Sequence, residues 1–172
     1  MKINANLRDD DDSFELGQLA EDLFVKVAQD KGYEVRKSSA KEDIWSHIDY
    51  YITNKQGDVK SFDVKSRKRT SRNDNKFNDE WVWVEFKNVR GYRGWLKGKA
   101  DFIAFETKDS FLSVRRKDLL ELCERLVNLE NKVSTSSEAK YSAYTRRGRK
   151  DVLSLVKLED IRQGLKTWEW CK

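Results

Sequence analysis

Alternating and helical patterns of apolar positions predict one helix followed by several strands. Residues 13–31 carry apolar side chains at helical spacing, with Ser13 as the expected N-cap and Gly32 as the expected end of the helix. Residues 47–53 and 58–66 alternate polar and apolar positions, and the segment NKQG between them is typical of a turn. We therefore expect a β-hairpin after the first helix.

The rest of the chain continues this mixed pattern. Residues 33–37, 81–86 and 101–107 are expected strands, and 113–130 has the leucine spacing of a helix. Residues 142–150 and 151–157 predict a second hairpin that turns at Arg147 and Gly148, and a short segment holding Trp168 and Trp170 ends the chain. Loops are expected at 67–80 and 88–99. The order of elements predicts a single α/β domain over residues 1–172, with a flexible acidic segment at 1–12.

Composition agrees with one soluble domain. The 172 residues are 38% hydrophobic and 12% aromatic, which is enough apolar material for one core. The N-terminus lacks the features of a secretory signal, and no apolar run reaches the roughly 18 residues that span a bilayer, so a cytoplasmic location and no membrane partner are expected. Cys123 and Cys171 show neither disulfide nor zinc spacing.

Positive charge is concentrated after residue 60. Residues 1–60 contain 9 basic and 13 acidic side chains, whereas residues 61–172 contain 26 basic and 17 acidic ones. Clustered Lys and Arg side chains gain affinity for polyanions by releasing phosphate counterions. The distribution favours a nucleic-acid partner, although a solvated charged surface would explain charge alone equally well.

Two acids on the predicted hairpin indicate a metal site. If residues 55–57 form a three-residue loop, Asn54 pairs with Asp58 and Asp49 falls opposite Asp63; a five-residue loop gives the same register. Side chains opposed on one face lie about 5 Å apart, so the two carboxylates would repel each other unless a cation or a proton intervened. Mg²⁺ prefers such oxygen ligands, and Lys65 points to the same face as Asp63 because strand side chains alternate.

The predicted helix adds a third acid. At about 100° per residue, Glu15 falls on the polar face and Glu21 falls among apolar side chains. An acid in that position either pairs with a buried base or faces a cation across the packed sheet. Glu21 is therefore preferred over Glu15 as the helix member of the site.

Glu21, the segment HIDYYI with Asp49, and the segment FDVKS with Asp63 and Lys65 resemble the PD-(D/E)xK nuclease superfamily, over about residues 13–66. This superfamily includes restriction endonucleases, Holliday junction resolvases and phage recombination nucleases. The resemblance implies a restriction-endonuclease-like α/β core, with a central mixed β-sheet flanked by helices and a catalytic core at 13–107. It also implies Mg²⁺ ligands at Asp49, Asp63 and the Val64 carbonyl.

In the same family, the lysine at the Lys65 position handles the nucleophilic water and the acid at the Glu21 position tunes or completes the metal site. The expected activity is a metal-dependent endonuclease that hydrolyses DNA, with Mn²⁺ able to replace Mg²⁺. The enzyme is expected to prefer junctions or branched DNA and to act as a homodimer. The alternatives are a non-catalytic nucleic-acid-binding module, or a nuclease that acts on RNA or in restriction.

Basic loops supply candidate contacts to nucleic acid, because Lys and Arg bind phosphates and aromatic rings stack on bases. The candidates are Arg67, Lys68, Arg69, Arg72, Arg90, Arg93, Trp95, Lys97, Lys99, Arg146, Arg147 and Arg149. Solvated loops and core aromatics would explain the same pattern. Glu85 is a possible extra ligand, and His47 is more simply a polar residue at the start of a strand.

Overall fold

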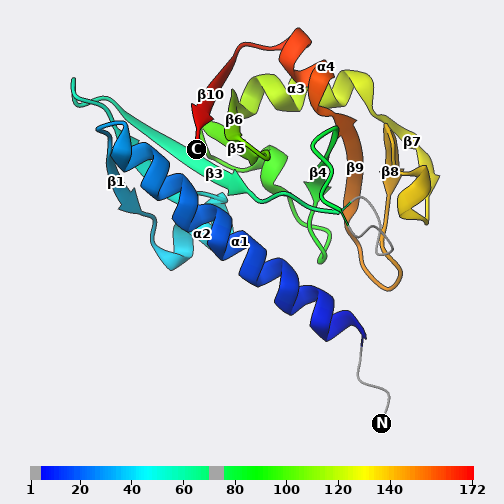
Figure 1. Ribbon diagram of the computed structural model, residues 1–172. Coiled ribbons are helices and arrows are strands. Elements are labelled where there is room, and N and C mark those ends of the chain that lie inside the picture. The colour runs from blue at the N-terminus through cyan, green and yellow to red at the C-terminus, as the bar shows by residue number, and fades with distance from the viewer. Residues whose placement is uncertain (1–4, 70–75) are drawn as a thin grey trace.

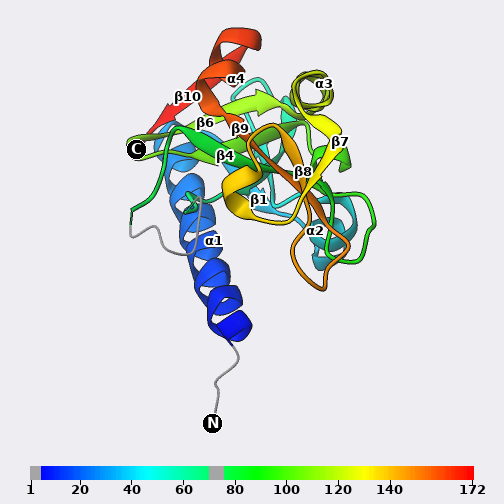
Figure 2. The same cartoon turned by 90° about the vertical axis from the view of Figure 1, so that its right-hand side faces the viewer.

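A long helix and two β-sheets form the part of the chain that the computed structural model describes, residues 5–69 and 76–172 (Figure 1). Side chains are described from Ser13 onward within the first helix. This helix, α1 (Ala5–Asp30), packs on one face of the larger sheet, and its N-terminal end extends beyond both sheets (Figures 1 and 2).

The larger sheet has six strands in the order β1-β2-β3-β5-β6-β10. Strands β3 and β5 are parallel and the other neighbours are antiparallel, so the sheet is mixed. The strands are β1 (Glu34–Lys37), β2 (Tyr50–Thr53), β3 (Val59–Lys65), β5 (Phe102–Glu106), β6 (Ser110–Arg115) and β10 (Thr167–Cys171). This arrangement confirms the α/β class and a mixed sheet flanked by helices.

The smaller sheet has four strands in the order β4-β9-β8-β7. Its strands are β4 (Trp81–Lys87), β9 (Val152–Lys157), β8 (Ser142–Tyr144) and β7 (Asn128–Val133). The remaining helices are α2 (Ala40–Ser46), α3 (Arg116–Leu126) and α4 (Leu158–Gly164), with 3₁₀ turns η1 (Trp95–Lys97) and η2 (Ser136–Glu138). Helices α3 and α4 lie on the side of the larger sheet opposite α1 (Figures 1 and 2). None of the helices in the described residues is both long and apolar enough to cross a membrane.

Alternation along β3 separates the apolar side chains from the polar ones. Phe62 and Val64 point into the core beneath α1, where Phe24 is fully buried. The Phe24 ring contacts three aromatic rings, those of Phe62 (5.3 Å), Phe111 (5.3 Å) and Trp170 (5.5 Å). Side chains on the opposite face of the sheet pack in a second core with α3, α4 and the smaller sheet. The polar side chains of β3 therefore face the second core, away from α1.

The predicted hairpin register is confirmed. Tyr50 pairs with Phe62 and Thr53 with Val59, and the Asn54 N–H donates to the Asp58 carbonyl at 3.0 Å. Gly57 closes the turn with a φ of 89°, a value that glycine adopts without steric cost. The second predicted hairpin also forms, since Tyr144 of β8 pairs antiparallel with Leu153 of β9.

Several predicted elements differ from the structure. Helix α1 begins at Ala5, so the acidic segment expected to be flexible is helical from that residue. The expected helix at 113–130 is split into the end of β6, α3 and β7. Strand β2 begins at Tyr50, not at His47. Helix α2 was not predicted, although Ser39 and Glu42 form a capping box at its start.

The core beneath α1 predicts a large loss of stability for Phe24→Ala. Removal of a ring that is fully buried and contacts three others should lower the free energy of unfolding by about 3–5 kcal/mol, measured by chemical denaturation. Phe14→Ala, on the same helix at a side chain that is 74% exposed, should change it by less than about 0.5 kcal/mol. Equal losses in the two variants would contradict the packing described for α1.

Candidate active site

Asp63 and Lys65 form an ion pair near the end of β3. The Lys65 Nζ lies 2.6 Å from Asp63 Oδ1, and the two side chains are 27% and 2% exposed. Asp63 Oδ2 is buried and has no hydrogen-bond partner among the residues that the structure describes. A buried carboxylate oxygen without a donor is costly, so this atom is available for a ligand that brings positive charge. The Lys65 ammonium also lies 4.9 Å from the centre of the Trp95 ring.

Asp49 is held beside this pair, just before β2. Its backbone N–H donates to the Phe62 carbonyl at 2.9 Å, and its carbonyl accepts from the Ser38 N–H at 2.9 Å. One side-chain oxygen, Oδ2, accepts from the Val64 N–H at 2.7 Å. The regular ladder ends at the pair of Tyr50 and Phe62. Beyond it, Asp49 reaches β3 through its backbone N–H and its side chain, where a direct cross-strand pair with Asp63 was expected.

The helix acid Glu21 joins the group from α1. Its Oε2 accepts from the Tyr50 hydroxyl at 3.3 Å. Burial raises the pKa of Glu21 to about 7, and the negative charge of Asp49 adds to the rise. Glu21 thus lies near Asp49, and Asp49 lies beside Asp63 and Lys65. Glu21 approaches from the α1 face of the sheet, whereas Asp63 and Lys65 lie on the opposite face. Val64 lies between Asp63 and Lys65 on β3, and its side chain packs in the core beneath α1. Its expected role as a carbonyl ligand stays a prediction.

The electrostatics of the ion pair follow from its burial. Burial raises the pKa of Asp63, Lys65 opposes the rise, and Asp49 adds to it. Burial alone would lower the pKa of Lys65, but the charges of Asp63 and Asp49 outweigh this effect and raise it. Lys65 is therefore held as an ammonium, and Asp63 binds a proton more readily than an ordinary carboxyl does.

Further charged residues surround the site and were not part of the predicted group. Burial and the charge of Asp49 raise the pKa of Asp43 on α2, and Lys65 opposes this rise. Glu85 of β4, weighed above as an extra ligand, raises the pKa of Lys65 through its charge. His47 is the left-handed C-cap of α2, with a φ of 53°, and is not on a strand as expected. The capping box at Ser39 is the sequence signal that could have predicted α2, and with it the position of Asp43.

The side chains fit a divalent cation held by few protein ligands. The described residues contain no group of three or more His, Cys, Asp or Glu side chains arranged to hold a metal. Mg²⁺ is commonly bound through one or two carboxylates, with water and substrate phosphate as the other ligands. Asp49 and Asp63 match that requirement, because Asp63 Oδ2 is unsatisfied and the two acids lie side by side.

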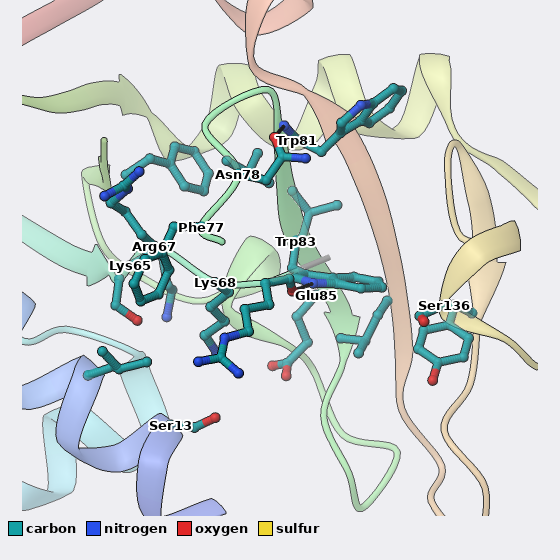
Figure 3. Close-up of a pocket in the computed structure, with 18 of the residues that line it drawn as sticks. Ser13, Lys65, Arg67, Lys68, Phe77, Asn78, Trp81, Trp83, Glu85 and Ser136 are labelled. Carbon is teal, nitrogen blue, oxygen red and sulfur yellow. Dashed lines mark hydrogen bonds between the residues drawn. The ribbon is translucent and has the colours of Figure 1, made fainter. Parts of the chain in front are cut away.

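A groove of about 1200 Å³ adjoins the site between the N-terminal half of α1 and the smaller sheet (Figure 3). Lys65 belongs to both the candidate site and the groove, whereas Glu21, Asp49 and Asp63 do not line the groove. The predicted basic residues that line it are Arg67, Lys68, Arg69, Arg146, Arg147 and Arg149. Two of them are neutralised: Arg67 Nε lies 2.7 Å from Asp79, and Arg146 Nε lies 2.6 Å from the fully buried Asp151.

The glycine-rich loop after β4 has one predicted contact residue at the groove. Trp95 is 7% exposed and packs in the second core with its ring near Lys65 and Phe105, and it forms part of the groove lining. The side chains of this loop that stay exposed lie outside the groove; they are Arg90, Arg93, Lys97 and Lys99. Gly94 is required by packing, because an added Cβ would lie 2.4 Å from the Glu85 carbonyl oxygen. Arg72 lies outside the described residues.

Glu21 should make stability depend on pH when divalent cations are removed with a chelator. Its raised pKa means that the folded state binds more protons than the unfolded state between about pH 4.3 and 7, so stability falls as pH rises through that window. Glu21→Gln should remove this component. Between pH 5 and pH 8, Glu21→Gln should therefore gain stability relative to the wild type. Because the carboxyl is only part-buried and solvent screens it, this gain in the free energy of unfolding should be on the order of 1–2 kcal/mol, measured by urea denaturation.

Glu15→Gln is the matched control, since it changes an exposed carboxyl on the same helix. It should leave the pH profile of the wild type unchanged. If the stability of Glu21→Gln changed with pH in the same way as that of the wild type, the Glu21 carboxyl would not have a raised pKa in the folded protein.

Comparisons with known proteins return no relatives. No protein-family model, no curated protein and no solved structure matches the chain. The conclusions about function therefore depend on the chemistry of Asp49, Asp63, Lys65 and Glu21, and on the basic groove next to them.

Proposed function

We propose that the protein is a metal-dependent nuclease that hydrolyses phosphodiester bonds of DNA. The observation that carries this proposal is the buried Asp63, whose Oδ2 lacks a partner while Asp49 and Lys65 lie beside it. Such an arrangement is costly for a fold unless a proton or a cation neutralises it, and a divalent cation is the occupant that also gives the group a chemical role. The PD-(D/E)xK resemblance stated above assigns chemistry to the same four residues.

The side chains divide the work by their positions. Asp49 and Asp63 would hold Mg²⁺ or Mn²⁺, and Glu21 would complete the site through water or stay a nearby negative charge. When bound, the cation supplies Lewis-acid polarisation of the phosphoryl oxygen and lowers the pKa of a bound water. Lys65, kept as an ammonium by its acidic neighbours, would orient the attacking water and stabilise the negative charge that develops on the phosphate.

The neighbouring groove supports a polyanionic substrate. Its lining holds seven Lys and Arg side chains and four Asp and Glu side chains, so its net charge favours phosphate. We extend the proposal to branched DNA as the preferred form and to a homodimer that places one site on each strand. The second candidate, a nucleic-acid-binding module without catalysis, is disfavoured because the three acids beside the groove would repel DNA in the absence of a cation.

Cleavage tests the proposal directly. Supercoiled plasmid, linear duplex, single-stranded DNA, a four-way junction and single-stranded RNA are incubated with the protein in Mg²⁺ or in a chelator. The wild type should cut DNA only with the metal, and Asp63→Asn should slow the reaction by about 10²–10⁴-fold, the range for loss of one positioned catalytic group.

Asp58→Asn is the matched control for this assay, because Asp58 is an exposed acid at the base of the same hairpin. It should retain wild-type activity, whereas loss of activity in Asp63→Asn prepared in the same way excludes a contaminating nuclease. Equal activity of Asp63→Asn and wild type would refute the proposed site. Cutting of RNA alone would move the substrate to RNA, and no cutting of any substrate would refute the nuclease function.

Metal binding can be measured without catalysis. A cation at about ten times its dissociation constant should stabilise the fold by about 1.4 kcal/mol and raise Tm by about 3–5 °C. Differential scanning calorimetry with Mg²⁺ and Mn²⁺ should show this rise for the wild type and for Asp58→Asn, and no rise for Asp49→Asn or Asp63→Asn. A rise of the same size in all four proteins would place the metal elsewhere.

A further inference from the structure

We propose that the groove beside Lys65 binds an unpaired strand of DNA and leads it to the carboxylates. This subsite rests on the proposed nuclease function and specifies the form of its substrate, a DNA with a single-stranded segment. Bases would lie against Phe77 and the paired rings of Trp83 and Tyr144. Phosphates would contact Lys68, Arg69 and Arg147, which form no side-chain ion pair with another described residue.

The size of the groove fits a segment of polymer. Its volume of about 1200 Å³ lies above the roughly 300–1000 Å³ of pockets that enclose a small ligand. Its walls come from distant parts of the sequence, among them α1, the end of β3 with the residues after it, β4, the segment at η2, and the hairpin of β8 and β9. Figure 3 shows Ser13 on one side and Ser136 on the other, with Lys68 and Trp83 between them.

Aromatic rings face this groove in positions suited to stacking. Phe77 is 39% exposed, and the Arg67 guanidinium lies 5.1 Å from its ring centre. Trp83 packs against Tyr144 with ring centres 5.6 Å apart, and its Nε1–H donates to the Arg69 carbonyl at 3.3 Å. Both the tryptophan and the tyrosine remain part-exposed. Each base stacked on such a ring contributes about 1–3 kcal/mol to single-strand binding.

The charged groups of the groove divide into paired and available ones. Arg67 and Arg146 are held by acids, and their ion pairs stabilise the walls. Among the described residues, Lys68, Arg69 and Arg147 form no side-chain ion pair, and all three are exposed. Unpaired cations in a concave surface attract phosphates at little cost, because no existing ion pair has to be broken.

Lys68 connects the groove to the acidic site. Burial in the groove lowers the pKa of Lys68, and the charges of Lys65 and Arg146 lower it further, whereas the charges of Glu85 and Asp63 partly oppose the change. Part of the Lys68 side chain nevertheless stays exposed to solvent. A strand lying along the groove therefore passes from Lys68 to Lys65, whose Nζ lies 2.6 Å from Asp63.

The same features disfavour a paired duplex in this groove. In a duplex, the faces of the bases are stacked on each other and present only edges to a protein. Rings in the wall contribute to binding only when bases are unpaired and can turn toward them. The aromatic lining therefore selects the single-stranded part of a branched or resected DNA.

Binding is tested by fluorescence anisotropy in a chelator, with a labelled single-stranded oligonucleotide and a blunt duplex of the same length. The wild type should bind the single strand at least about 10-fold more tightly. Phe77→Ala and Trp83→Ala should each weaken single-strand binding by about 5- to 100-fold, as expected for the loss of one stacked base. Trp83→Phe should keep most of the wild-type affinity for the single strand, because it keeps an aromatic ring. Arg147→Glu should weaken single-strand binding, and this loss of affinity should be largest at low salt.

Two matched variants control for general effects. Trp168→Ala removes a part-buried tryptophan of β10 that does not line the groove, and Arg125→Glu reverses an exposed charge on α3. Both should bind the single strand as the wild type does. If Phe77→Ala and Arg147→Glu bind normally, or if the duplex binds as tightly as the single strand, the groove is not a single-strand subsite.

The result separates this inference from the nuclease proposal. Metal-dependent cutting that is lost in Asp63→Asn but unchanged in Phe77→Ala and Trp83→Ala refutes the subsite alone. Absence of all cutting, together with selective single-strand binding that requires Phe77, refutes the nuclease and leaves a strand-binding groove.

Discussion

The contact of the Lys65 ammonium with the buried Asp63 carboxylate is the interaction on which the site depends. Asp63 is 2% exposed, so its charge is not stabilised by water, and its second oxygen has no donor. Lys65 compensates part of this cost, but Asp49 beside it adds negative charge. When both carboxyls are ionised, the site has more negative charge than its own lysine neutralises, and either a proton or a bound cation compensates the excess.

This arrangement can exist because the opposite face of the same strand is well packed. Phe62 and Val64 lie beneath α1 in an aromatic core around Phe24, and that core holds β2 and β3 in register. A well-packed core contributes enough stability to tolerate unsatisfied polar atoms nearby. Helix α1 has a second role, because it carries Glu21, which accepts from the Tyr50 hydroxyl and lies near Asp49.

The basic residues fall into structural and available groups. Arg67, Arg146 and the buried Arg116 have carboxylate or carbonyl partners and support loops or helix ends. Lys68, Arg69 and Arg147 lie in the groove without ion-pair partners among the described residues. Net charge alone cannot make this distinction, because it counts a neutralised arginine and an exposed one equally. If the proposed function holds, the groove between the N-terminal half of α1 and the smaller sheet is where a phosphate backbone would lie.

The sequence by itself determined the first helix, the hairpin register, and the candidate group of Glu21, Asp49, Asp63 and Lys65. These features follow from local periodicity and from the length of one turn, which do not depend on distant residues. Only the tertiary structure decided that Trp95 is buried, that Asp43 and Glu85 lie near the site, and which arginines are paired. Those outcomes depend on contacts between segments far apart in the chain, such as α1 with β3 and β4 with β9, and no pattern within one segment specifies them.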